Sequence, residues 1–203
     1  HSKTDLLTQM VGEFPELQGI MGKYYALESG QAADVAAAIG EQYLPRTVSD
    51  KLPETIPGAV LSILDKADLV IASFGLGLEP TSSMDPYGLR RSASAIFKIM
   101  LERKIDLSLN SLTGHIRQEL GAYILKDKEA ALAGKLDFFF KDRFKAVLAD
   151  RGLREDLVDA VMASGFDRPY EVFERAQALS KILKNESFPK ACKVAERTFN
   201  ILK

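Results

Sequence analysis

The stretch TSSMDPYGLRRSASAIFKIM, from Thr81 to Met100, decides the fold expected for this chain. Asp85 followed by Pro86 is typical of a helix start, because the carboxylate accepts free N–H groups of the first turn and proline suits the first helical position. We therefore predict a helix from Pro86. Its apolar residues recur every three or four positions and form one stripe: Leu89, Ala93, Ile96, Phe97 and Met100.

Arg90 and Arg91 lie just off this stripe, one turn in from the helix start. Two guanidinium groups beside a buried seam either pair with carboxylates of the same chain or present their N–H donors to a phosphate. From the chemistry alone, internal pairing is favoured over phosphate binding. The expected partners are Asp65 and Asp68 of the preceding helix.

The same helical spacing continues on both sides of this stretch. Further helices are predicted over residues 4–14, 15–30, 31–43, 58–74, 112–125, 127–149, 154–163, 168–184 and 187–202, with a Pro-rich surface loop at 45–57. No segment alternates apolar and polar residues as a strand does, so we predict an all-α fold. The linker-like run IDLSLNSL, capped at Asn110 or Ser111, divides it into two helical domains, 1–108 and 109–203.

The composition excludes several classes of protein. The chain has 203 residues, 46% of them hydrophobic and 27% charged, which is enough to bury a core. No apolar run approaches the roughly 20 residues that span a bilayer, so we expect no membrane segment. Cys192 is the only cysteine, which excludes an internal disulfide and fits a reducing cytoplasm. The chain opens without Met, directly in a helical pattern, as a piece of a longer protein would.

The charge is unevenly distributed along the chain. Residues 1–110 carry 10 Lys and Arg against 14 Asp and Glu, whereas residues 175–203 carry 7 against 2. The apolar positions of the last helix are expected to face the core, so that its basic side chains face outward. These apolar positions are Phe188, Ala191, Val194, Ala195, Phe199 and Leu202.

The residues predict no catalytic or metal site. The two histidines, His1 and His115, are too far apart in the chain for a His-rich site. Asp5, Asp65 and Asp68 have the oxygen chemistry for Mg²⁺, but carboxylates on buried helices more often pair with neighbours such as Lys66, Arg90 or Arg91. The phosphate loop, dinucleotide fingerprint and nucleophile elbow are all missing from the sequence.

Four segments resemble the beta subunit of bacterial glycyl-tRNA synthetases, in matching order and spacing over essentially the whole chain. They are TDLLTQMVGEFPELQGIMGKYYA (4–26), EQYLPR (41–46), LDKADLVIASFGLGLEPTSSMDPYGLRR (64–91) and ERTFNILK (196–203). The resemblance implies the later part of a larger beta subunit. Residues 1–108 are then an HD-type helical domain. Residues 109–203 are then a helical anticodon-binding domain with a truncated C-terminal end, similar to that of arginyl-tRNA synthetases.

The resemblance also implies a function. The full enzyme ligates glycine to its tRNA with ATP and Mg²⁺, as two alpha and two beta subunits, and the alpha subunit carries the class II catalytic core. This chain then holds glycine tRNA in the cytoplasm, with no cofactor of its own. The expected tRNA surface comprises Arg143, Lys181, Lys184, Lys190, Lys193 and Arg197, and Arg90 and Arg91 reach the acceptor arm if they are not structural.

Two alternatives stay open at this point. One is a metal-dependent phosphohydrolase of the HD type, for which Thr4-Asp5 stands nearest to the required His-Asp pair. Its missing histidines count against it. The other is a helical module that contacts only protein, as docking to the alpha subunit requires. The basic C-terminal part favours tRNA binding over this second alternative.

Overall fold

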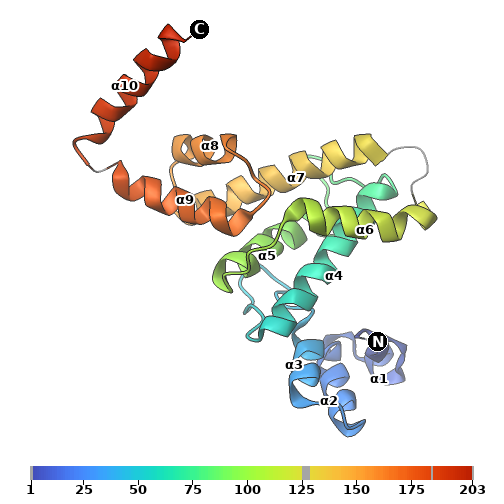
Figure 1. The fold of residues 1–203 in the computed structure, drawn as a ribbon. Coiled ribbons are helices and arrows are strands. Elements are labelled where there is room, and N and C mark those ends of the chain that lie inside the picture. The colour runs from blue at the N-terminus through green and yellow to red at the C-terminus, as the bar shows by residue number, and fades with distance from the viewer. Residues whose placement is uncertain (1, 125–128, 184, 203) are drawn as a thin grey trace.

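The fold is all-helical, as the sequence predicts. The computed structural model describes residues 2–124, 129–183 and 185–202, and within these ranges it contains helices and loops but no strand. Figure 1 shows a cluster of short helices at the N-terminal end, a central group of longer helices, and a last helix that extends away from the rest. No helix of the described part is both long and apolar enough to cross a membrane.

The N-terminal cluster is more broken than predicted. The predicted helix 4–14 begins later, at Gln9, and Thr8 caps it, because the Thr8 hydroxyl accepts the N–H of Val11 at 3.4 Å. The second predicted helix is interrupted at Gly19, whose φ of +78° turns the chain so that its N–H reaches the buried carboxylate of Asp5 at 2.7 Å. The cluster comprises η1 (Thr4–Leu7), α1 (Gln9–Glu13), η2 (Pro15–Leu17), α2 (Ile20–Glu28) and α3 (Ala33–Glu41).

The central helices follow the predicted pattern closely. α4 is capped by Thr55, whose hydroxyl accepts the N–H of Gly58 at 3.0 Å, and it joins the N-terminal cluster to the central group. The remaining elements are α4 (Ile56–Gly75), α5 (Leu89–Glu102), α6 (Leu109–Ile124), α7 (Glu129–Asp150), α8 (Glu155–Ala163), α9 (Pro169–Ile182) and α10 (Phe188–Ile201).

Helix α5 begins three residues later than predicted. Asp85 does cap it, since its carboxylate accepts the N–H of Leu89 at 2.8 Å and that of Arg90 at 3.0 Å. Pro86 belongs to the turn before the helix, and Gly88 holds the N-cap position with a φ of +65°. A left-handed residue is needed there so that the chain can fold back and bring the Asp85 carboxylate over the helix end.

The predicted apolar stripe of α5 is the centre of the core. All five of its residues are at most 1% exposed. The ring of Phe97 lies 4.9 Å from that of Phe144 and 6.0 Å from that of Phe140, both on α7, and 6.1 Å from that of Phe166. Tilted and edge-on aromatic pairs at these distances add to the energy of burial. Helix α5 thus joins α4, α7 and α9 in one packed group.

The predicted boundary at 108/109 does not separate two hydrophobic cores. One cluster of buried residues runs from Ala59 to Ala176, across the boundary. Ser108, not Asn110 or Ser111, caps α6, and the carboxylate of Asp167 accepts both the Ser108 hydroxyl and the N–H of Asn110 at 2.9 Å. The assignment of the two halves to an HD-type and an anticodon-binding domain stays a prediction.

We expect Phe97→Ala to destabilise the chain by about 3–5 kcal/mol, because a fully buried aromatic side chain leaves a cavity that the packed core cannot close. Phe138→Ala is the matched control, since Phe138 is 75% exposed on α7 and its loss changes stability by about 0.5 kcal/mol or less. Denaturant unfolding of both variants measures the difference. Equal stabilities would contradict the central role of Phe97.

Candidate functional site

The predicted basic surface divides into neutralised and free side chains. Arg143 on α7 forms an ion pair with its neighbour Asp142 and is partly shielded. Lys181 is exposed at the end of α9, and Lys190, Lys193 and Arg197 are exposed on α10. None of these four has an ion pair within the described ranges. Lys184 lies outside the described residues.

Helix α10 has two opposite faces. The spacing of Lys190, Lys193 and Arg197 places them together on one side, and Phe188 and Ala195 lie on the other. The prediction that the apolar positions of this helix face the core is wrong, because no residue of α10 is buried. Figure 1 gives the reason, since α10 leaves the end of α9 and extends away from the central helices.

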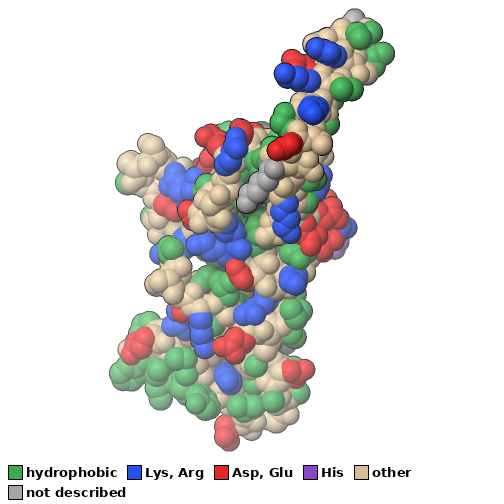
Figure 2. Space-filling view, turned by 90° about the vertical axis from the view of Figure 1, so that its left-hand side faces the viewer, with side chains coloured by type: hydrophobic (Ala, Val, Ile, Leu, Met, Phe, Trp, Pro, Cys, Tyr) green, Lys and Arg blue, Asp and Glu red, His purple; other side chains and the backbone are tan. Residues whose placement is uncertain are grey.

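The surface therefore carries apolar side chains as well as charges at both ends of the molecule. Figure 2 shows Lys and Arg beside hydrophobic side chains along the projecting helix, and a hydrophobic patch at the opposite end, over the N-terminal helices. A hollow of about 1270 Å³ lies there between α2, α3 and the start of α4. Its lining is mostly apolar and includes Ala26, Val35, Ile39, Val60 and Leu64.

Arg90 and Arg91 do not make the predicted pairs. Arg90 donates from Nη2 to the carbonyl oxygen of Thr81 at 2.7 Å, so its internal role is in the turn before α5. Arg91 is exposed, and the described residues offer it neither an ion pair nor a hydrogen bond. The prediction fails because Asp65 instead pairs with Lys3, and Asp68 faces the solvent.

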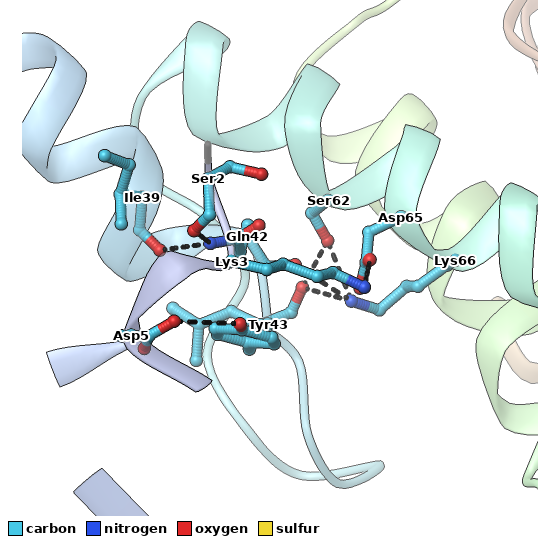
Figure 3. Close-up of polar contacts among 10 residues, drawn as sticks. Ser2, Lys3, Asp5, Ile39, Gln42, Tyr43, Ser62, Asp65 and Lys66 are labelled. Atoms are coloured by element: carbon cyan, nitrogen blue, oxygen red, sulfur yellow. Dashed lines mark hydrogen bonds and ion pairs between the residues drawn. The ribbon is translucent and has the colours of Figure 1, made fainter. Parts of the chain in front are cut away.

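A buried polar cluster around Lys66 was not predicted as a unit. Figure 3 shows the ammonium group of Lys66 between α4 and the segment that follows α3. It donates to the Leu44 carbonyl at 2.9 Å, the Ser62 hydroxyl at 2.9 Å and the Gln42 carbonyl at 3.5 Å. Ser62 and Lys66, four residues apart in a nearly continuous apolar run, were the sequence signal for this cluster.

The cluster ties the loop after α3 to the central helix. Lys66 is only 7% exposed, and burial lowers its pKa to about 8, against the opposing effect of the nearby Asp65 charge. Burial also raises the pKa of Tyr43, whose hydroxyl lies 3.4 Å from Asp5. Through these hydrogen bonds the groups hold the backbone around them in place.

The three carboxylates considered for a metal do not converge on one site. Asp5 accepts the Gly19 N–H, Asp65 pairs with Lys3, and Asp68 is exposed. His115 is exposed on α6. Within the described residues, no three His, Cys, Asp or Glu side chains come together in a way that suits a metal ion. The phosphohydrolase alternative therefore finds no metal-binding geometry in this part of the chain.

We expect the stability of the chain to rise as the pH increases from about 8 to 10.5, because the folded state has released the Lys66 proton in this range and the unfolded state still holds it. The full rise from this group is about 3 kcal/mol, since one pKa unit corresponds to about 1.4 kcal/mol. Denaturant unfolding at several pH values measures it. The Lys66→Met variant should lack this rise, and parallel pH profiles of the two proteins would contradict it.

Comparison with known proteins agrees with the sequence resemblance. Residues 1–163 match the family described as glycyl-tRNA synthetase beta subunit. Proteins named glycine–tRNA ligase beta subunit are similar over the chain: that of Desulforamulus reducens is 44% identical over 100% of the chain, that of Geobacter sulfurreducens 44% over 99%, and that of Bacillus subtilis 42% over 100%.

The similarity extends over the chain but over only part of each relative. The chain spans 29%, 29% and 28% of the lengths of these three proteins, respectively. Its placement in the later part of the subunit stays a prediction. With a family match over most of its residues and identities above 40% along its length, the chain belongs to the glycyl-tRNA synthetase beta subunit family.

Proposed function

We propose that this chain is a tRNA-binding part of a glycyl-tRNA synthetase, and that it supports the ATP-dependent ligation of glycine to its tRNA in the cytoplasm. The observation that carries the proposal is the similarity, along the whole chain, to proteins named glycine–tRNA ligase beta subunit. In this proposal the alpha subunit contains the catalytic core, and two alpha and two beta subunits form the enzyme. The full enzyme uses ATP and Mg²⁺, and this chain contributes part of the surface that holds tRNA.

The tRNA surface that we propose is the basic face of α10, continued by Lys181 at the end of α9. Lys190, Lys193 and Arg197 are exposed and have no internal carboxylate partner within the described residues, so their charges are available to phosphates. Arg143 contributes less, because Asp142 already neutralises it. Each contact to a phosphate of a single-stranded backbone, as in an anticodon loop, contributes about −0.7 to the slope of log K against log salt concentration.

We further propose that residues 1–108 form an HD-type domain and that residues 109–203 belong to an anticodon-binding domain. The shared core packs α4 to α9 together, so we assign the anticodon contact to the exposed basic side chains at the end of α9 and on α10. The uncovered apolar face of α10 supports an arrangement in which other parts of the longer beta subunit pack against it. A helix of this length is marginally stable by itself in water and needs such a contact.

We expect Lys190→Glu together with Lys193→Glu to raise the KM for glycine tRNA in the reconstituted enzyme, because two cations that face the phosphate backbone become anions. The slope of log K for tRNA binding against log salt concentration should become less negative by about 1.4, which corresponds to two lost single-strand contacts. Glycine-dependent ATP–pyrophosphate exchange should be unchanged, since it takes place without tRNA. Aminoacylation and exchange assays on the same preparation separate the two effects.

The matched control is Lys23→Glu together with Lys51→Glu, which makes the same change of net charge on exposed residues of the N-terminal half. This control should charge tRNA like the parent enzyme. Normal aminoacylation of tRNA by the α10 variant at all salt concentrations would contradict the proposed contact surface. Loss of subunit assembly with normal tRNA affinity would favour the module that contacts only protein.

A further inference from the structure

A small pocket lies between the outer face of α5 and the loop that precedes α4. Its volume is about 370 Å³, and its wall includes Arg91, Ser94 and Lys98. Spacings of three and four residues place these three side chains on one face of α5, above one another. The opposite face of the same helix is the buried apolar stripe, so the backbone that carries the three side chains is held firmly.

The described residues do not neutralise the cations of this pocket. Within the described residues, Arg91 and Lys98 have neither an ion pair nor a hydrogen bond, and Arg90, which also lines the pocket, uses one donor on the Thr81 carbonyl. Asp85 lies at the pocket too, but both of its carboxylate oxygens accept backbone N–H groups of the α5 start. Asp150, exposed at the end of α7, is the other carboxylate in the wall.

The position of Arg91 depends on the turn before the helix. A Cβ at Gly88 would stand 2.6 Å from Nη2 of Arg91, so the glycine leaves the room that the guanidinium group occupies. The side chain therefore folds back toward the start of α5, as helical side chains do. This arrangement places a planar donor group at the pocket, and within the described residues no acceptor is hydrogen-bonded to it.

We propose that this pocket binds a phosphoryl group, with Arg91 and Lys98 as its charged donors and the Ser94 hydroxyl as a third. A guanidinium group offers two parallel N–H donors to phosphate oxygens, and an ammonium group adds a mobile point charge. The same chemistry fits two sources, a backbone phosphate of RNA and free inorganic phosphate. The RNA source rests on the tRNA-binding function proposed above, whereas the anion site itself does not.

The first test is a titration of the 203-residue chain with inorganic phosphate, followed by NMR or calorimetry at constant ionic strength. We expect saturable binding, and we expect Arg91→Ala with Lys98→Ala to raise the Kd by about tenfold or more, since each removes a charge-assisted contact. The melting temperature of this double variant should stay unchanged, because neither side chain has an ion pair or a hydrogen bond within the described residues. Asp150→Asn should lower the Kd by removing a repulsive charge.

The matched control is Lys23→Ala with Arg154→Ala, which removes the same charge from exposed positions outside the pocket. No saturable phosphate binding, or equal affinities of the pocket double variant and the control, would overturn the proposal. An unchanged Kd of the Asp150→Asn variant would also overturn it, because the anion would then lie outside this pocket.

A second experiment identifies the molecule that supplies the phosphoryl group. It measures the binding of a glycine tRNA transcript at several salt concentrations. If the pocket variant weakens tRNA binding and reduces the salt slope by about 1 to 2, the pocket takes an RNA phosphate. If phosphate binding is lost and tRNA binding is not, the pocket is a site for the free anion. Because phosphate binding is measured without tRNA, failure of the α10 proposal and failure of this one give different results.

Discussion

The packing of Phe97 against Phe140, Phe144 and Phe166 is the contact on which the rest of the structure depends. Phe97 lies in the middle of α5, which packs against α4, α7 and α9. The free energy of burying such a group is large, and interiors are packed too tightly for it to shift. Through this helix the chain on both sides of residue 108 becomes one unit.

The same burial decides which side chains are available for binding. Because one face of α5 is committed to the core, Arg91, Ser94 and Lys98 are held on the opposite face in a constant arrangement. Helix α10 is the contrasting case, since it has a basic and an apolar face and the described part of the chain buries none of its residues. The two surfaces proposed for binding therefore differ in their support, because α5 is packed on the core and α10 projects from it.

The N-terminal cluster is joined to the central helices through polar groups as well as apolar ones. Lys66 places one ammonium group among the Gln42 and Leu44 carbonyls and the Ser62 hydroxyl, and Asp65 beside it pairs with Lys3. Buried carbonyl groups at a helix end need donors, and here a lysine supplies them. These contacts join α4 to the loop after α3, so the role that the geometry supports for this cluster is structural.

The sequence by itself determined the helical fold, the central helix α4, the buried stripe of α5 and the family. Helical periodicity and resemblance to a family can both be recognised within short segments of the chain, so neither requires knowledge of which helices pack together. The sequence determined less about turns: Gly88 and Gly19 adopt left-handed conformations that depend on Asp85 and Asp5 being folded against them. Only the tertiary structure decided the ion partner of Asp65, the hydrogen-bond acceptor of Arg90 and the exposure of α10. Charged side chains pair with whatever the packing of distant helices brings near, and a periodic pattern gives the faces of a helix without saying whether another element covers them.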